Sequence, residues 1–235
     1  FWQMLLDGVN IKTSLPSPDT FVQKFKAAKE AGDEVICILI ASKLSGTYQG
    51  AMLAKQIVDY DGIHVIDAGH AAASVAEKML VIAACRMRDQ GCTAEEIARR
   101  LEQLRGSVRL IACLDTLEYL ARGGRLPAAV ASIGTKLQLK PIIVFGENGE
   151  IQVVKKCMGS KRAMRDMTEM VTECRINPEY PVIPIFAQND RNCQEYVASL
   201  KNAGCVGAMQ VPQGIGATIG SYIGPGGYGI VFVEK

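Results

Sequence analysis

Residues 35–59 constrain the fold more than any other part of the chain. Residues 35–41 form a short apolar run with β-branched side chains, which is typical of a strand buried on both faces. From Tyr48 onward the apolar residues recur at helical spacing. The polar sequence Ser-Lys-Leu-Ser-Gly-Thr at residues 42–47 connects the two segments. The pattern therefore predicts a buried strand that runs through a polar loop into a helix.

The loop between that strand and helix has the chemistry of an anion-binding site. The first turn of a helix carries backbone N–H groups that have no partner inside the helix, and these groups favour negative charge. The hydroxyls of Ser45 and Thr47 add small donors beside them. We therefore expect the loop to suit an anionic group above the sheet edge. The alternative is that Ser45 or Thr47 only caps the helix, because such residues are favoured at any helix start.

The arrangement of expected strands and helices changes along the chain. In residues 1–106 buried strands alternate with helices, which predicts parallel pairing through right-handed crossovers. In residues 107–235 the dipeptide Asn148-Gly149 marks the turn of a hairpin, whose strands pair antiparallel. The sequence thus predicts an α/β protein with two domains. The N-terminal one is a doubly wound parallel-sheet domain, and the C-terminal one is an α+β domain with a mixed, largely antiparallel sheet.

Several local signals predict individual elements. Thr93 and Glu96 have the spacing of a capping box at a helix start. A short helix is expected over residues 127–137 and a strand over residues 205–211. Residues 224–229 formally fit the dinucleotide-binding pattern Gly-X-Gly-X-X-Gly, but a strand follows them where that motif needs a helix. We expect these glycines to shape a turn that passes close to another part of the protein.

Composition argues against several classes of function. The 26 basic and 24 acidic side chains of this 235-residue chain leave a formal net charge of +2, with no basic surplus for nucleic acid. The eight cysteines contain no Cys-X-X-Cys pair, which favours reduced, packed thiols and a cytoplasmic location. Neither the cysteines nor the two histidines have metal-ligand spacing, so we expect no metal and no cofactor. The longest apolar run is far shorter than the ~20 residues that a membrane helix needs, so we expect no stable membrane insertion.

Six distinctive sequence blocks span essentially the whole chain. The blocks are TSLPSP at 13–18, SKLSGTYQGA at 42–51, VID at 65–67, DTLEYLARGGRL at 115–126, LKPII at 139–143 and IGSYIGPGGYGIVF at 219–232. These blocks occur in the order typical of the DegV family, so the chain resembles that family. The resemblance implies a carrier, not an enzyme, that binds a long-chain fatty acid in a cleft between two domains. In some bacteria such a protein hands the fatty acid to a dihydroxyacetone-kinase-like partner, a fatty-acid kinase that phosphorylates the carboxylate.

The resemblance also implies which residues hold the ligand. The family's carboxylate contacts fall on Thr13 and Ser45 in this chain, both of which are loop hydroxyls. The adjacent residues implied to support these hydrogen bonds are Ser14, Gly46 and Thr47. The family often has His where this chain has Tyr222, whose phenol can still donate a hydrogen bond. The family begins with a strand that ends in an Asp-Ser loop, and this chain starts after it, so we expect one strand and part of the pocket wall to be missing.

Two other functions stay open at the level of the sequence. The chain could be a small-molecule enzyme that uses the Ser/Thr loop on a phosphorylated or carboxylated substrate, or a regulatory interaction module with an incidental pocket. The turn Arg122-Gly123-Gly124-Arg125 is expected on an exposed face near the domain junction. Its two arginines are either simply solvated, or they dock an acidic partner surface or shield the ligand's head group.

Overall fold

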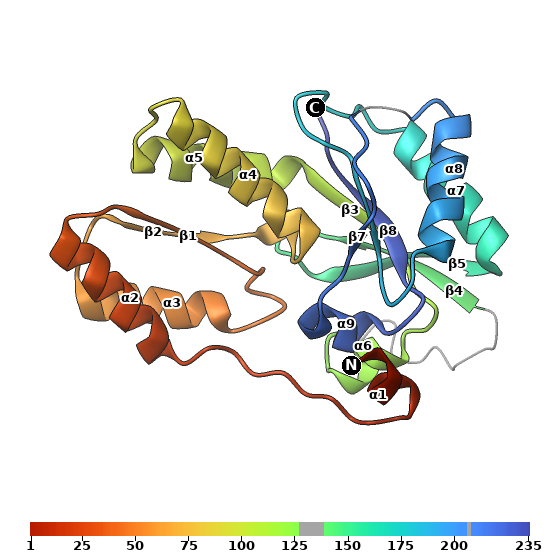
Figure 1. Cartoon of the computed structure of the whole chain (residues 1–235), viewed down its shortest axis with the longest axis horizontal. Helices are drawn as coiled ribbons and strands as arrows, with labels where there is room; N and C mark the ends of the chain where they lie inside the picture. The colour runs from red at the N-terminus through yellow and green to blue at the C-terminus, as the bar shows by residue number, and fades with distance from the viewer. Residues whose placement is uncertain (127–138, 206–207) are drawn as a thin grey trace. The chain divides into compact units, whose positions relative to one another are not determined.

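A computed structural model of the chain describes residues 1–126, 139–205 and 208–235 (Figure 1). The chain forms two compact units. Unit 1 contains residues 1–13, 108–146 and 150–235, and unit 2 contains residues 14–107 and 147–149. The domain limits of 1–106 and 107–235 stay a prediction. Within the described residues, no helix is both long enough and apolar enough to span a membrane.

Unit 2 is built on a two-stranded parallel sheet of β1 (Val35–Leu39) and β2 (Ile63–Asp67). Val35 lies opposite Ile63 and Leu39 lies opposite Asp67, so the two strands end at the same edge. The parallel pairing expected from the sequence is confirmed. The α-helices of this unit are α2 (Pro18–Ala31), α3 (Thr47–Val58), α4 (Val75–Asp89) and α5 (Ala94–Leu104), and its 3-10 helices are η1 (Gly69–Ala71) and η2 (Arg105–Ser107).

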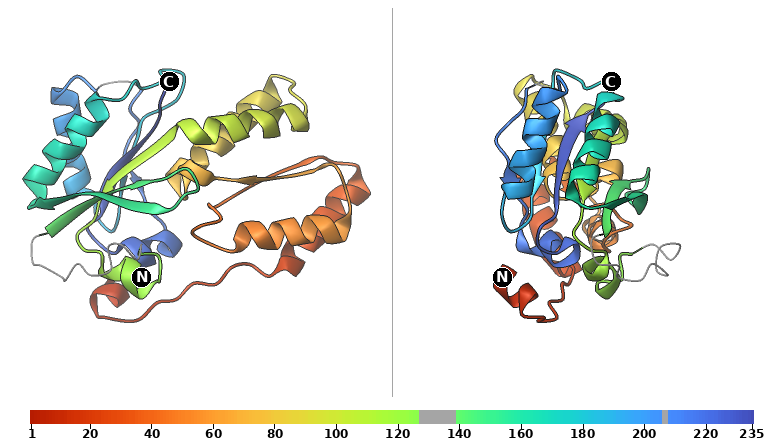
Figure 2. Two further views of the ribbon diagram at one scale, coloured as in Figure 1. Left: turned by 180° about the vertical axis from the view of Figure 1, so that it is seen from behind. Right: turned by 90° about the vertical axis from the view of Figure 1, so that its right-hand side faces the viewer.

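The helices of unit 2 cover both faces of this sheet (Figure 2). Side chains alternate between the two faces of a strand, so Val35, Cys37 and Leu39 all point to one side of β1. They pack on the apolar face of α2 and α3, where Phe25 is buried. Helices α4 and α5 contact the sheet from the opposite side. This sandwich is the doubly wound arrangement that the sequence predicts.

The helix starts of unit 2 follow their sequence signals. The Ser17 hydroxyl accepts a hydrogen bond from the Asp19 N–H at 3.3 Å and so caps α2. The capping box of α5 is confirmed, because the Thr93 N–H donates to Glu96 Oε2 at 3.0 Å and the Glu96 N–H donates to Thr93 Oγ1 at 3.2 Å. These contacts satisfy backbone donors that the helix itself cannot pair.

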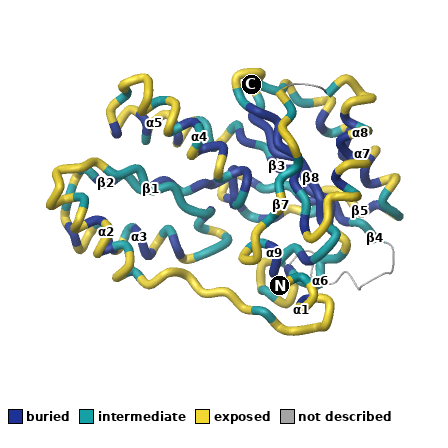
Figure 3. The backbone as a smooth tube through the Cα atoms, viewed as in Figure 1, coloured by how far each residue is buried: buried dark blue, intermediate teal, exposed yellow. Residues whose placement is uncertain are grey.

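Unit 1 contains a six-stranded sheet in the order β5-β4-β3-β8-β6-β7. The strands are β3 (Val108–Cys113), β4 (Leu139–Phe145), β5 (Ile151–Met158), β6 (Ile183–Phe186), β7 (Gln213–Gly214) and β8 (Tyr228–Val233). The neighbours pair antiparallel except for β6 with β7. The helices are α1 (Trp2–Leu6), α6 (Glu118–Arg122), α7 (Ser160–Thr172), α8 (Arg191–Asn202) and α9 (Ala217–Ile223). Helices α7 and α8 pack on the sheet, whose central strands β3 and β8 are buried (Figure 3).

The C-terminal elements follow the sequence expectation with one correction. The hairpin of β4 and β5 is confirmed, with Gly149 at φ 81° in its turn. The strand expected over residues 205–211 is wrong in its described part, because Met209 forms only an isolated bridge with Val182. Pro212 has no N–H to donate, so pairing resumes only at β7. Residues 206–207, and the helix expected over 127–137, lie outside the described residues.

The loop that joins β2 to α4 contains two residues in backbone conformations that favour glycine. Ala72 has φ 43° and ψ −78°, and Ser74 has φ 59° and ψ −127°. Such conformations cost a residue with a Cβ atom on the order of 1–3 kcal/mol. The loop is nevertheless fixed, because the Ala72 carbonyl accepts a hydrogen bond from the Ala41 N–H at 2.8 Å. The strained segment therefore ties the start of α4 to the loop after β1.

Replacing Ser74 with Gly should stabilise the protein. The substitution removes the steric strain of a Cβ atom at positive φ, although glycine loses more backbone entropy on folding. We expect Ser74→Gly to raise the free energy of unfolding by about 1 kcal/mol, measured by urea denaturation. Ala73→Gly is the matched control, since Ala73 is buried and has no positive φ, and it should destabilise. Equal destabilisation by both variants would contradict the strain at Ser74.

The Glu77 carboxyl in the first turn of α4 should make stability depend on pH. Burial raises its pKa from 4.5 to about 7, although a hydrogen bond from the Ser74 N–H opposes the shift. The folded state thus holds the proton more tightly than the unfolded chain, so this contribution to stability is complete below pH 4.5 and is lost as pH rises to about 7. Glu77→Gln stays neutral. Its free energy of unfolding relative to wild type should rise between these pH values, and parallel pH profiles from denaturant melts would contradict this assignment.

Candidate functional site

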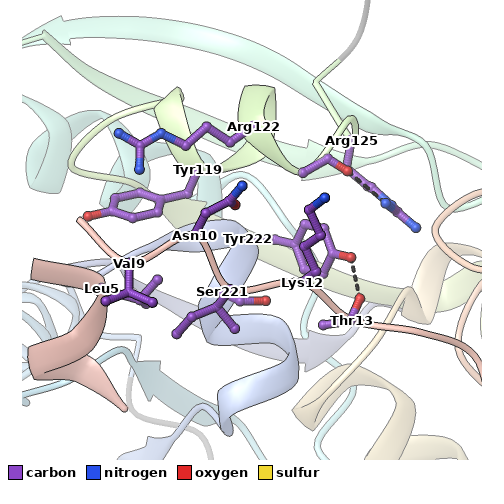
Figure 4. Close-up of a pocket in the computed structure, with 12 residues that line it drawn as sticks. Leu5, Val9, Asn10, Lys12, Thr13, Tyr119, Arg122, Arg125, Ser221 and Tyr222 are labelled. Carbon is purple, nitrogen blue, oxygen red and sulfur yellow. Dashed lines mark hydrogen bonds between the residues drawn. The ribbon is translucent and has the colours of Figure 1, made fainter. Parts of the chain in front are cut away.

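Unit 1 contains a pocket of about 250 Å³ that gathers side chains from distant parts of the sequence (Figure 4). The segment after α1 forms one part of its wall, α6 and the following glycine turn form another, and α9 forms a third. The residues that line it are Leu5, Val9, Asn10, Ile11, Lys12, Thr13, Tyr119, Arg122, Gly123, Arg125, Ser221 and Tyr222. Three of these are basic and none is acidic, so the pocket favours a negatively charged group.

The hydroxyls of Thr13 and Tyr222 hydrogen-bond to each other in this pocket. The two residues are 209 positions apart in the sequence. Thr13 is exposed and Tyr222 is half-buried on α9. Each hydroxyl has one proton and two lone pairs, so if the phenol donates to Thr13, the Thr13 proton is available for an anion. The pair therefore offers a donor whose orientation is set by a neighbouring side chain.

A glycine and an arginine fix the position of the Tyr222 ring. A Cβ atom at Gly123 would lie only 2.3 Å from Tyr222 Cδ1, so the ring fits because position 123 has no side chain. The Arg125 guanidinium lies over the same ring, with its Cζ atom 4.9 Å from the ring centroid. Arg125 Nη1 also donates to the Gly123 carbonyl at 2.7 Å. Backbone contact and cation–π attraction thus hold the phenol in place.

The glycine-rich segment 224–229 forms the close turn that the sequence predicts. Gly224 has φ 72°, and a Cβ atom there would lie 2.2 Å from Tyr119 Cδ2. Tyr119 in turn lies under the Arg122 guanidinium, whose Cζ atom is 5.9 Å from the ring centroid, and Arg122 forms an ion pair with Glu118. The two arginines of the Arg-Gly-Gly-Arg turn are exposed, and both line the pocket. Their role in docking a partner stays a prediction.

Unit 2 holds the second group of hydroxyls that the sequence singles out. Thr47 begins α3, and its N–H donates to Ser45 Oγ at 3.3 Å, while the two side-chain oxygens are 2.8 Å apart. If Thr47 also donates its hydroxyl proton to Ser45, both lone pairs of Ser45 are used and its own proton points elsewhere. Ser45 can then hydrogen-bond an anion while its Oγ still accepts from the first N–H of α3. The two interpretations of this loop are therefore compatible.

The structure places the expected residues in two groups, one in each unit. Thr13 and Tyr222 are in contact within unit 1, and Ser45, Gly46 and Thr47 are consecutive in unit 2. Ser14, the first residue of unit 2, is exposed. Sequence reasoning missed Lys12 and Tyr119 as pocket residues. Tyr119 lies inside the block at 115–126 and Lys12 directly precedes the block at 13–18. Nothing in the sequence indicated that these two distant blocks line one pocket.

An α/β fold with a parallel sheet in one unit, a mixed sheet in the other and a pocket lined by hydroxyl and basic groups defines a class of ligand-binding protein. The family model described as "Uncharacterised protein, DegV family" matches residues 3–235. The chain belongs to the DegV family.

Relatives and solved structures give the same family. A DegV domain-containing protein of Caldanaerobacter subterraneus is 34% identical over 240 residues, covering 100% of this chain and 83% of the relative. A protein of Thermotoga maritima named "Fatty acid-binding protein" is 30% identical over 232 residues, covering 95% of this chain and 78% of the relative. A Thermus thermophilus DegV family structure, described as showing fatty acid binding, superposes with a TM-score of 0.86 at 29% identity, covering 99% of this chain and 82% of that one.

Gly123→Ala should displace the Tyr222 ring. Gly123 has φ −77°, so alanine is not strained there by its backbone conformation. Its Cβ would lie 2.3 Å from Tyr222 Cδ1, a severe clash, and 3.2 Å from the Tyr119 carbonyl oxygen, a much milder one. We expect the variant to lower the melting temperature much more in wild type than in a Tyr222→Ala background, because the severe clash then has no partner. The matched control is Gly124→Ala, which has φ 70° and open space around its Cβ position. Gly124→Ala should lower the melting temperature equally in both backgrounds, because its strain comes from the positive φ and not from Tyr222. A Gly123→Ala effect that is independent of Tyr222 would contradict the packing.

Proposed function

We propose that this protein binds a long-chain fatty acid and carries it without transforming it. The observation that carries the proposal is the Thr13–Tyr222 hydroxyl pair in a pocket with three basic side chains. Membership of the DegV family supports it, because relatives of this chain are named or described as fatty-acid-binding proteins. In this proposal Thr13 and Ser45 donate hydrogen bonds to the carboxylate. Tyr222 and Thr47 orient those two hydroxyls, and the remaining supporting residues are Ser14 and Gly46.

The chemistry of a fatty-acid head group fits these donors. A carboxylate that leaves water must recover its hydrogen bonds, since an unpaired buried charge costs several kcal/mol or more. Hydroxyls provide those bonds without the rigid geometry of a guanidinium fork. At about 250 Å³ the unit 1 pocket lies just below the ~300–1,000 Å³ typical of small-molecule sites. It therefore has the size of a head-group site, and the acyl chain needs further room.

The acyl chain supplies most of the affinity in this proposal. Burying about fourteen methylene groups at about 0.8 kcal/mol each contributes on the order of 11 kcal/mol before the costs of ordering the ligand. The head group contributes orientation. A hydrogen bond to a charged group is worth about 1.5–3 kcal/mol, so losing one weakens binding without abolishing it.

We further propose that the bound fatty acid is presented to a kinase of the dihydroxyacetone-kinase-like type in the cytoplasm, which phosphorylates the carboxylate. Thr13 is exposed, so a carboxylate on its hydroxyl would be accessible to a second protein. This accessibility and the family resemblance support the presentation step. A lipid-loaded protein that yields no acyl phosphate with such a kinase and ATP would contradict the presentation step alone.

Replacing either hydroxyl should weaken fatty-acid binding while the fold survives. Thr13→Val and Ser45→Ala each remove one donor to a charged group, at about 1.5–3 kcal/mol, which corresponds to an affinity loss of about tenfold or more. The double variant should be less affected than the sum of the single variants if both groups hold one carboxylate. The measurement is a titration with a fluorescent fatty acid, alongside thermal melts.

Thr20→Val is the matched control, because Thr20 is an exposed threonine in the first turn of α2 that belongs to neither hydroxyl pair. Wild-type affinity in the double variant would contradict the site, and the absence of fatty-acid binding by wild type would contradict the function. Native mass spectrometry separates the alternatives. A co-purifying acyl chain supports the carrier, turnover of a soluble substrate supports an enzyme, and an empty protein with a tight protein partner supports an interaction module.

A further inference from the structure

One carboxylate in unit 2 joins the two loops that follow the parallel strands. Asp67 is the last residue of β2 and is half-buried. Its Oδ1 atom accepts a hydrogen bond from the Ser42 N–H at 3.1 Å and another from the Gly69 N–H at 3.0 Å. Ser42 belongs to the loop after β1, and Gly69 belongs to the loop after β2. Asp67 is therefore a bridge between two segments that the chain does not connect directly.

The bridge acts on the loop that carries Ser45. Ser42 opens a turn that is closed by the Ala41 carbonyl, which accepts hydrogen bonds from the Leu44 N–H at 2.9 Å and from the Ser45 N–H at 3.3 Å. Once Ser42 is fixed by Asp67, this turn fixes the backbone of Ser45. The Ser45 hydroxyl then has its direction set by Thr47, as described above. The Asp67 carboxylate is thus linked to the Ser45 backbone through the Ser42 N–H, the Ala41–Ser42 peptide and the Ala41 carbonyl.

Asp67 is itself held in place from the other side of the sheet edge. Its backbone carbonyl accepts a hydrogen bond from Arg105 Nη1 at 2.8 Å. Arg105 Nη2 forms an ion pair with Glu102 Oε2 at 2.8 Å, which orients the guanidinium. The next peptide is also fixed, since the Ala68 N–H donates to the Leu39 carbonyl at 2.9 Å. The carboxylate is therefore a rigid acceptor and not a mobile surface acid.

The negative charge of Asp67 is not what the bridge needs. Two backbone N–H groups require an acceptor oxygen in the right place, and an amide oxygen can supply it as well as a carboxylate oxygen. A negative charge near a carboxylate-binding loop would by itself oppose an anionic ligand. An isosteric neutral residue should therefore keep the loop in position, whereas a residue without an acceptor should release it.

We infer that Asp67 is a positioning residue for the Ser45 hydroxyl, acting as a hydrogen-bond acceptor that locks the loop after β1 to the loop after β2. The inference rests on the proposed function, because it assigns Asp67 to the same carboxylate site. It adds a residue that touches no ligand and that controls affinity through another side chain. It also predicts that the contribution of Asp67 depends on the presence of Ser45.

The test compares palmitate with its uncharged methyl ester by isothermal titration of the full chain. We expect Asp67→Ala to weaken palmitate binding about tenfold, to affect the methyl ester much less, and to cause no further loss in a Ser45→Ala background. Asp67→Asn should bind palmitate within about twofold of wild type or more tightly. Asp61→Ala is the matched control, since Asp61 is an exposed acid at the opposite end of β2. It should bind both ligands as wild type does.

A second measurement, which needs no ligand, distinguishes local loss of the bridge from loss of the whole fold. Amide hydrogen exchange of the apo protein should show faster exchange at Ser42 and Gly69 in Asp67→Ala, and wild-type rates in Asp67→Asn. Unchanged exchange in Asp67→Ala would overturn the bridge. If Ser45→Ala weakens palmitate binding and Asp67→Ala adds its effect independently, the positioning role is wrong while the proposed function stands. If Ser45→Ala binds palmitate as wild type does, the proposed carboxylate site itself fails.

Discussion

Parallel pairing of β1 with β2 is the constraint on which the arrangement of unit 2 depends. Two parallel strands end at the same edge of a sheet, so the loops that follow them lie side by side. Ligands in open α/β sheets are typically bound beyond this edge. Here the edge collects the Ser45 hydroxyl from one loop and the Asp67 carboxylate from the end of the other strand. The backbone strain at Ala72 and Ser74 lies in the same region, where the fold fixes conformations that isolated residues avoid.

Unit 1 also holds a hydroxyl in a fixed position, but it does so by packing aromatic rings against glycines. Its pocket depends on glycines that let aromatic rings approach the backbone, at Gly123 for Tyr222 and at Gly224 for Tyr119. Each ring also lies under a guanidinium, which adds a cation–π contact to the packing. The rings therefore serve as rigid supports. Tyr222 presents its hydroxyl to Thr13 because its ring has little freedom to lie elsewhere.

The hydroxyls of Thr13 and Ser45 share one structural feature that suits a carrier protein. In each case a second side chain, Tyr222 or Thr47, hydrogen-bonds the hydroxyl that is proposed to contact the ligand. Such a neighbour orients the donor before the ligand arrives, so less entropy is lost on binding. Within the pocket of unit 1 the basic side chains favour an anion, whereas the hydroxyls define where it would bind. Different side chains therefore attract the anion and orient it. This division also explains why a single substitution should weaken binding without abolishing it.

The sequence by itself determined the local elements and the family. Apolar periodicity located β1 and α3, Thr93 and Glu96 determined a helix start, and Asn148-Gly149 determined a hairpin, because these signals act over a few residues. The ordered blocks identified the DegV family and, through it, Thr13 and Ser45 as candidates. Only the tertiary structure decided that Tyr222 meets Thr13, that Gly123 makes room for the ring, and that Asp67 bridges two loops. Such contacts join residues that are far apart in the chain, and no local pattern specifies the distance between them.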